Sequence, residues 1–384
     1  MNNSEKLILG IDASRNRSGG ARAHLIGMLS ECDPEKYGIK QIHVWAPRAL
    51  LNQLPDVSWL IKHNPPALEA SLLRQLIWQA FSLAGEVKAH NCSILFATDA
   101  STLCRFIPLV VLGQDMLSYE PGVMAYFGYS VARLRLLAIL IVQNLAFKRA
   151  NGVIFLTRYA GKLIQQSCGK LQIVEYIPHG VDKMFNNVQK VNIWPTSRKE
   201  PIRCIYVSGT EMYKHQWVVV RAFALLKKRG YDVVLVLVGG GEGTAVQMLQ
   251  DEIEAHDVSG VFVRRYDFLS HDDLPMLLAQ SDLFVFASSC ENMPVTLLEA
   301  MAVGLPIACS NCGPMPEILA DGGVYFDPKD AESVAKAIEE IILSKDLRLT
   351  ISERAKALSQ QYTWERCANE TFAFIVSRYH GIPI

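Results

Sequence analysis

Two glutamates with seven residues between them, Glu291 and Glu299, stand where a loop runs into a predicted helix. Pro294 suits the first turn of that helix, because its fixed φ and missing N–H are tolerated there. N–H groups at a helix start lack intrahelical partners and suit phosphate or sugar oxygens. The carboxylate of Glu299 can accept two hydrogen bonds from a vicinal diol such as that of ribose. A surface helix with two ordinary glutamates is the alternative, since this spacing alone arises often by chance.

The candidate binding residues around this helix start are Asn292, Met293, Pro294, Val295 and Thr296. The apolar run Arg203–Ser208 leads into the loop SGTEMYKHQ, which begins at Ser208. This loop carries Thr210 and Lys214. A solvated loop lysine is the plain interpretation of Lys214 from the residues alone.

Asp115 follows the apolar run Leu109–Leu112, where a turn or capping role fits it. Glycines mark two further loops. Gly19 and Gly20 come after the first apolar run, and Gly239 opens the stretch GGGEG. Glycine permits positive φ and close approach of a backbone to a ligand. An ordinary turn is the alternative for Gly19–Gly20.

Short apolar runs alternate with helical patterns along the whole chain, which is typical of parallel sheets covered on both faces. The first half has strand candidates at Leu7–Ile11, Ile42–Trp45, Ile94–Ala97, Leu109–Leu112, Val153–Leu156 and Val174–Ile177. The second half has them at Arg203–Ser208, Val233–Val238, Val261–Arg264, Leu283–Ala287, Ile307–Cys309 and Val324–Phe326. Helices are predicted at Ala67–Gln79, Ser130–Arg149, Gln216–Arg229, Thr244–Ala255, Asp273–Gln280, Pro294–Ala302, Ala331–Ser344 and Asp346–Gln361.

We therefore predict an α/β protein with two doubly wound, Rossmann-like parallel sheets that face each other across a cleft. Ligands bind such sheets beyond the carboxyl ends of the strands, where the candidate residues lie. The polar stretch 186–200 reads as a linker, so the predicted domains are 1–185 and 201–363, followed by a helix at 364–384.

Composition excludes several classes of protein. The 384 residues carry 38 Lys plus Arg and 38 Asp plus Glu, which argues against a dedicated nucleic-acid binder. The first residues do not read as a signal peptide, and no apolar stretch is long enough for a membrane span. The 9 cysteines are scattered and fit a reduced protein, so we expect a cytoplasmic location.

The helical stretch Ser130–Arg149 is apolar with basic residues near its ends. Such a helix more often packs into its own domain. Peripheral contact with the cytoplasmic face of the inner membrane is the alternative.

The segment Ser288–Leu319, with both glutamates and the run LEAMAVGLPI, resembles the retaining glycosyltransferases of the GT-B fold. Within them it is similar to the large family four, the group 1 type. GGGEG and the pair Gly19–Gly20 extend the resemblance, as does Ile177–Asp182, where His179 replaces the family's Asn. The resemblance implies that domain 1–185 is the acceptor side, that domain 201–363 binds the nucleotide sugar, and that the last helix returns to brace the first domain.

The resemblance also implies the roles of the candidates. Glu291 would approach the donor sugar, Glu299 the ribose, and Lys214 the diphosphate. The family usually has an Arg beside this lysine and a histidine where this chain has Gln114–Asp115, so Asp115 is carried as a candidate contact. Arg15 or Arg17 could supply the missing charge.

The implied activity is the retaining, metal-independent transfer of a hexose-type sugar from a nucleotide-sugar donor, UDP- or GDP-linked, with no further cofactor. The acceptor would be a saccharide or a lipid-linked molecule in cell-surface polysaccharide or lipopolysaccharide assembly. No metal site is expected, because the chain lacks the Asp-x-Asp signature of metal-dependent enzymes. Two alternatives remain: a GT-B nucleotide-sugar 2-epimerase, and a non-catalytic glycosyltransferase-like partner subunit.

Overall fold

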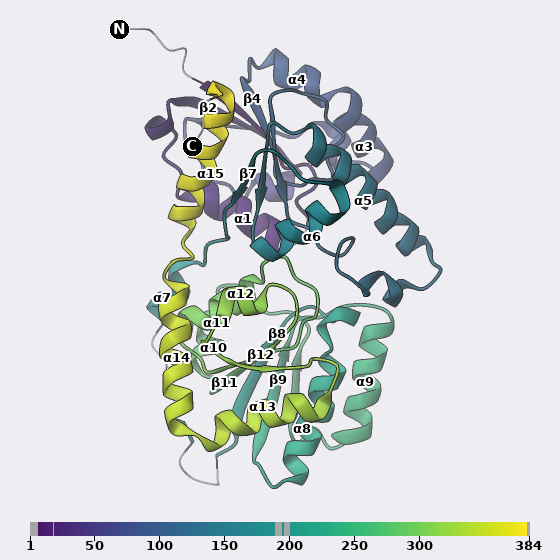
Figure 1. The fold of residues 1–384 in the computed structure, drawn as a ribbon, viewed down its shortest axis with the longest axis vertical. Coiled ribbons are helices and arrows are strands. Elements are labelled where there is room, and N and C mark those ends of the chain that lie inside the picture. The colour runs from purple at the N-terminus through teal and green to yellow at the C-terminus, as the bar shows by residue number, and fades with distance from the viewer. Residues whose placement is uncertain (1–6, 18, 189–193, 196–199, 382–384) are drawn as a thin grey trace. The chain divides into compact units, whose positions relative to one another are not determined.

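The computed structural model describes residues 7–17, 19–188, 194–195 and 200–381. These residues form two compact units (Figure 1). Unit 1 is Met1–Gly180 with Thr363–Ile384, and unit 2 is Val181–Tyr362. Part of the predicted linker 186–200 lies outside the described residues. The short helix α7 (Lys183–Asn187) packs on α11 and therefore belongs to unit 2, although the sequence placed it partly in the first domain.

Unit 1 contains a seven-stranded parallel sheet in the order β3-β2-β1-β4-β5-β6-β7. Its strands are β1 (Leu7–Asp12), β2 (Ile39–Trp45), β3 (Leu60–His63), β4 (Ile94–Ala97), β5 (Leu109–Gly113), β6 (Gly152–Phe155) and β7 (Val174–Tyr176). The central strands are buried because helices cover both faces of the sheet (Figure 1). These helices are α1 (Gly19–Ser30), α2 (Arg48–Leu51), α3 (Leu72–Phe81), α4 (Leu83–Ala89), α5 (Val131–Arg149), α6 (Arg158–Cys168) and α15 (Trp364–His380).

Unit 2 contains a six-stranded parallel sheet in the order β10-β9-β8-β11-β12-β13. Its strands are β8 (Ile202–Val207), β9 (Val233–Val238), β10 (Val263–Tyr266), β11 (Leu283–Phe286), β12 (Ile307–Ser310) and β13 (Val324–Phe326). Besides α7, its helices are α8 (Gln216–Lys228), α9 (Thr244–His256), α10 (Leu274–Ala279), α11 (Val295–Val303), α12 (Met315–Leu319), α13 (Ala331–Leu343) and α14 (Lys345–Ser359).

Both sheets reverse their strand order beside their first strand. β1 lies between β2 and β4, and β8 lies between β9 and β11. In open parallel sheets the crevice at such a switch point is where ligands bind. The loops after β1 and β8, which carry Gly19–Gly20 and Thr210–Lys214, therefore stand at the two expected positions.

The α/β architecture with two parallel sheets is confirmed, and most predicted elements differ from the observed ones only at their ends. β3 was not predicted, because LIKH shows neither an apolar run nor strict alternation. It is an edge strand with a single neighbour, so it needs less burial than the others. The predicted helix Ala67–Gln79 is divided into a 3₁₀ turn, Pro66–Glu69, and α3, because the backbone is extended at Ala70.

Helix α15 packs on α1 in unit 1, although the chain reaches it from unit 2. Gly27 of α1 makes this contact close, since a Cβ there would stand 2.3 Å from the ring of Trp364. The first turn of α15 is capped by Thr363, whose side chain accepts the N–H of Arg366 at 3.1 Å. The glycine and the cap together fix the start of this helix on unit 1.

Among the described residues, no helix has the length and apolar character needed to cross a membrane.

Candidate functional site

The loops after β8 and β9 in unit 2 are locked together at their glycines. The N–H of Thr210 donates to the Gly240 carbonyl at 3.0 Å, and the Thr210 hydroxyl lies 3.3 Å from the Gly239 carbonyl. Gly239 has φ +117°, and a Cβ there would stand 2.3 Å from the carbonyl oxygen of Ser208. Glycine is thus required here by the contact between two loops. Thr210 is buried, so its predicted contact with a ligand stays a prediction.

Lys214 and Glu291 form an ion pair that joins the loop after β8 to the loop after β11. Both side chains are only 14% exposed, so water screens the pair weakly. The Tyr206 hydroxyl donates to the Lys214 carbonyl at 2.8 Å, which fixes the backbone of the short 3₁₀ turn Met212–Lys214. The structure therefore brings together two of the predicted catalytic residues on neighbouring strands.

His215 strengthens this connection between the two loops. Its φ is +50°, a strained value for a side-chain-bearing residue, and it stands at the start of α8. Its Nε2 lies 2.8 Å from the Ser289 hydroxyl, and the Ser289 N–H donates to the Tyr213 carbonyl at 2.8 Å. Burial lowers the pKa of His215 to about 4, so the ring is neutral at pH 7. His215 was not among the predicted site residues, because a strained conformation leaves no mark in the sequence.

The loop after β11 ends at Pro294, whose carbonyl accepts the N–H of Leu298 at 3.3 Å and so begins α11. Asn292, Met293 and Pro294 are buried, whereas Val295 and Thr296 are half-buried. The first N–H groups of α11 have no acceptor within the helix. The N-terminus of α11, just after Glu291, therefore carries a partial positive charge.

Glu299 is buried in the middle of α11 and has one satisfied oxygen. Its Oε1 accepts a hydrogen bond from His271 Nε2 at 2.9 Å. Its Oε2 is buried and has no hydrogen-bond partner among the described residues. Leaving a buried carboxylate oxygen unpaired is unfavourable, so this atom suits a ligand that donates a hydrogen bond.

His271, in the loop after β10, is a second site residue that was not predicted from the sequence. Its hydrogen bond to Glu299 raises its pKa above the usual value, against the opposing effect of its partial burial. The ring also lies against Phe185 of α7, with 5.3 Å between the centroids. His271 therefore fixes the orientation of Glu299 from the edge of the site. No motif marks it, and only the spatial neighbourhood of α11 identifies it.

In unit 1, Gly19 and Gly20 form the exposed first turn of α1. Neither has a positive φ, so this turn does not use the conformational freedom of glycine, and the approach of its backbone to a donor stays a prediction. A Cβ at either position would meet nothing within 4 Å. Because packing within unit 1 does not require glycine here, the bare backbone at this helix start remains open to a ligand.

Asp115 accepts the N–H of Leu117 at 3.0 Å and thereby closes a turn after β5. Burial raises its pKa above the usual range. The turn role considered for Asp115 is thus observed, and its contact with a ligand stays a prediction.

Arg17 is exposed and its guanidinium donates to the Leu68 carbonyl at 3.4 Å, while Arg15 is half-buried. Whether either arginine replaces the missing charge beside Lys214 stays a prediction.

The fold is that of solved GT-B proteins. A sucrose-phosphate synthase from Thermosynechococcus elongatus has a TM-score of 0.78 at 16% identity, covering 95% of this chain and 97% of that one. Anabaena HepE in complex with UDP-glucose has a TM-score of 0.70 at 19% identity, covering 96% and 98%. At these identities the likeness concerns the fold alone.

The family of unit 2 follows from its sequence. Residues 190–358 match the model of the family described as glycosyl transferases group 1. The O-antigen chain mannosyltransferase B of Escherichia coli is 28% identical over 198 residues, 51% of this chain and 50% of the relative. The N-acetyl-alpha-D-glucosaminyl L-malate synthase of Bacillus anthracis is 31% identical over 183 residues, 46% of this chain and 44% of the relative. The protein therefore carries a group 1 glycosyltransferase domain in a GT-B fold, and the matches span about half the length of these relatives.

The pair of His271 and Glu299 gives a stability effect that depends on pH. Because the pKa of His271 is raised in the folded state, the pair contributes stability that is fully present below the unfolded pKa of about 6.5. That contribution is lost as the pH rises through the folded pKa. We predict that His271→Gln lowers the free energy of unfolding more at pH ~5.5 than at pH ~8.5. Urea unfolding of both proteins across this range measures the difference, and a gap that stays constant with pH would contradict the ion pair.

Proposed function

We propose that the protein is a retaining glycosyltransferase that moves a hexose-type sugar from a nucleotide-sugar donor to a saccharide or lipid-linked acceptor. Unit 2 would hold the donor and unit 1 the acceptor side. The observation that carries the proposal is the buried, half-satisfied carboxylate of Glu299, in a domain of the glycosyltransferase group 1 family. A ribose diol supplies hydroxyl donors for the oxygen that the protein leaves unpaired.

Negative charge on the departing diphosphate is what the site must stabilise. Lys214 offers the ammonium group, and the start of α11 offers N–H groups with their partial positive charge. A bound diphosphate would compete with Glu291 for the positive charge of Lys214. Glu291, which contacts Lys214 through Oε1, would still have its other oxygen available for a hydroxyl of the donor sugar. The ion pair would hold both side chains in position for the donor.

Retention of configuration follows from a front-face displacement in this proposal. The bond from the anomeric carbon to the diphosphate oxygen breaks, and the acceptor oxygen attacks from the same face. The acceptor proton passes to the departing phosphate oxygen, so the step needs no protein nucleophile. The protein contributes by holding donor and acceptor in line and by stabilising the leaving group.

The proposed donor base and biological setting are supported by the names of similar proteins. HepE was solved with UDP-glucose, and one relative is named as an O-antigen chain mannosyltransferase. We accordingly propose a UDP- or GDP-linked hexose as the donor. The proposed pathway is the assembly of a cell-surface polysaccharide or lipopolysaccharide. The protein would then work in the cytoplasm, where nucleotide sugars are made.

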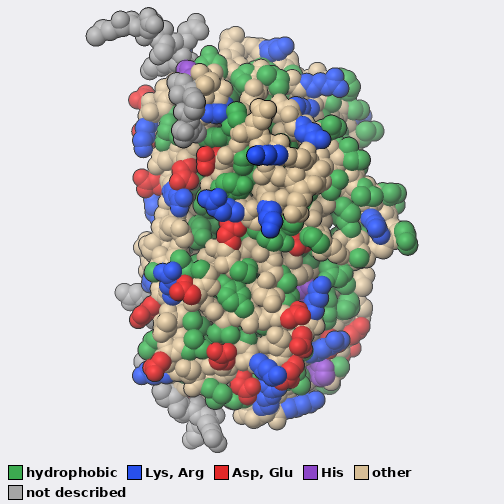
Figure 2. Space-filling view, in the orientation of Figure 1, with side chains coloured by type: hydrophobic (Ala, Val, Ile, Leu, Met, Phe, Trp, Pro, Cys, Tyr) green, Lys and Arg blue, Asp and Glu red, His purple; other side chains and the backbone are tan. Residues whose placement is uncertain are grey.

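Helix α5 gives a reason to place the acceptor at a membrane surface. Val131, Leu134, Ile141 and Leu145 are exposed, and their spacing of successive turns puts them along one stripe of the helix. Figure 2 shows hydrophobic side chains in the region that α5 occupies in Figure 1. Arg133 and Arg135 stand near its start, Lys148 and Arg149 near its end, and the helix contains no acidic residue. An apolar stripe with basic flanks suits the interface of a bilayer with anionic lipids. We propose that α5 lies on such a surface, where a lipid-linked acceptor is presented.

Two other functions predict different products. A nucleotide-sugar 2-epimerase converts the donor without any acceptor, and a non-catalytic partner subunit consumes no donor at all. Donor consumption measured with and without an acceptor extract separates the three. Acceptor-dependent release of nucleoside diphosphate supports transfer, whereas acceptor-independent isomerisation or no consumption would overturn the proposal.

We predict that Lys214→Ala lowers turnover more than it raises the donor KM, because charge on the departing oxygen grows as the bond breaks. Loss of one such stabilising group typically lowers kcat roughly 10²–10³-fold. Initial rates over a range of donor concentrations give both constants. Lys228→Ala, at an exposed lysine of α8, is the matched control and should keep full activity. A change confined to KM would remove Lys214 from the catalytic account.

For the membrane contact, we predict that the wild-type protein sediments with vesicles containing phosphatidylglycerol. The double variant Leu134→Glu/Ile141→Glu should remain in the supernatant, because it places two charges in the apolar stripe. Leu349→Glu, at an exposed leucine of α14 in unit 2, should sediment like the wild type. Equal sedimentation of all three proteins would show that α5 is not the contact surface.

A further inference from the structure

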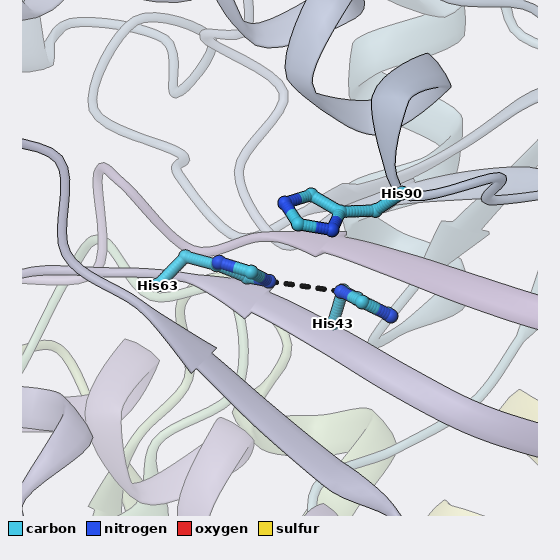
Figure 3. Close-up of side chains that lie close together, drawn as sticks. All are labelled: His43, His63 and His90. Atoms are coloured by element: carbon cyan, nitrogen blue, oxygen red, sulfur yellow. Dashed lines mark hydrogen bonds between the residues drawn. The ribbon is translucent and has the colours of Figure 1, made fainter.

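Three histidines gather in unit 1, outside the site described above. His43 lies on β2, His63 ends β3, and His90 follows the last turn of α4. His43 Nδ1 and His63 Nε2 are 2.8 Å apart, and one ring nitrogen of each histidine lies within 4.8 Å of the others. Figure 3 shows the ring of His90 standing over the hydrogen-bonded pair. The three histidines come from separate elements, so no ligand spacing marks them in the sequence.

The scaffold holds these rings in place before any ligand arrives. β2 and β3 pair in parallel, with Trp45 opposite His63, which puts His43, Trp45 and His63 on one face of the sheet. The indole of Trp45 stacks on His63 with 4.8 Å between the centroids. Its Nε1 donates to Glu86 of α4 at 2.8 Å, and the other oxygen of Glu86 accepts from Trp78 at 2.7 Å. Glu86 thus ties α4 to the sheet one turn before His90.

From this geometry we propose that His43, His63 and His90 bind a divalent late transition metal ion such as Zn²⁺, a site separate from glycosyl transfer. Three imidazoles without a carboxylate favour Zn²⁺, Ni²⁺ or Cu²⁺ over Mg²⁺ or Ca²⁺. Zn–N bonds of 2.0–2.1 Å place tetrahedral ligand atoms about 3.3 Å apart. The hydrogen-bonded pair must open slightly and His90 must move inward, and His90 is exposed and able to do so.

The proposed ion would take an electron pair from one nitrogen of each neutral ring. The proton now shared between His43 and His63 would move to the far nitrogen of the ring that carries it, so no redox step or other reactant is needed. Water would fill the fourth position at the exposed side of His90. The ion would link edge strand β3 to α4 and stabilise unit 1.

The test uses the full chain without a polyhistidine tag, after treatment with a chelator. Titration calorimetry with Zn²⁺ should give one ion per chain, and Co²⁺ should give the visible absorption of a tetrahedral complex. We expect His90→Ala and His63→Gln each to weaken Zn²⁺ binding by more than about tenfold. His256→Ala, at an exposed histidine of α9, is the matched control and should bind like the wild type.

Zn²⁺ should also raise the Tm of the wild type and leave that of His90→Ala unchanged, because an ion that binds only the folded state stabilises it. His90 is exposed, so this variant retains its fold and carries the test even if His63→Gln does not. No binding by the wild type would overturn the proposal. Binding that survives both substitutions, or that His256→Ala abolishes, would overturn it equally.

Discussion

The ion pair between Lys214 and Glu291 bridges the point where the sheet of unit 2 reverses its strand order. β8 and β11 are neighbours there, so the loops that follow them meet at the carboxyl edge. Each partner keeps the other's charge compensated in a largely buried place, where an isolated charge would be strongly unfavourable. Because His215 and Ser289 connect the same two loops, the pair stands on a rigid base.

The same constraint explains why the start of α11 is available to a ligand. Two hydrogen bonds hold the loop after β11. The Ser289 N–H donates to the Tyr213 carbonyl, and the Ser310 hydroxyl donates to the Ser288 carbonyl at 2.5 Å. With the loop fixed, α11 begins at a set position, and Glu299 is carried along with it. His271 then satisfies one oxygen of that carboxylate and leaves the other for a ligand. In the proposed function, this arrangement would receive the diphosphate at Lys214 and the start of α11, and the ribose diol at Glu299.

Much of this could be predicted from the sequence, for identifiable reasons. Val233–Val238 and Ile94–Ala97 are uninterrupted apolar runs between helical patterns, and both strands have the predicted bounds. Residues that follow parallel strands lie at the carboxyl edge of the sheet, so the proximity of Lys214 and Glu291 could be predicted from the sequence. β3 was missed because its edge position relaxes the demand for apolar residues. Three other features depend on contacts between loops, which no local sequence pattern encodes. They are the close packing of Gly239 on Ser208, the αL conformation of His215 and the hydrogen bond between His271 and Glu299.

Nucleotide binding through Glu299 is the central claim, and titration calorimetry tests it most directly. UDP, GDP and their hexose derivatives would be titrated into the wild type, Glu299→Ala and the control Glu254→Ala, at an exposed glutamate of α9. A charge-assisted hydrogen bond contributes about 1.5–3 kcal/mol, so the account predicts that Glu299→Ala binds the preferred nucleotide roughly ten to a hundred times more weakly. The control should bind like the wild type. Equal affinity for the nucleotide in a folded Glu299→Ala variant would contradict the account.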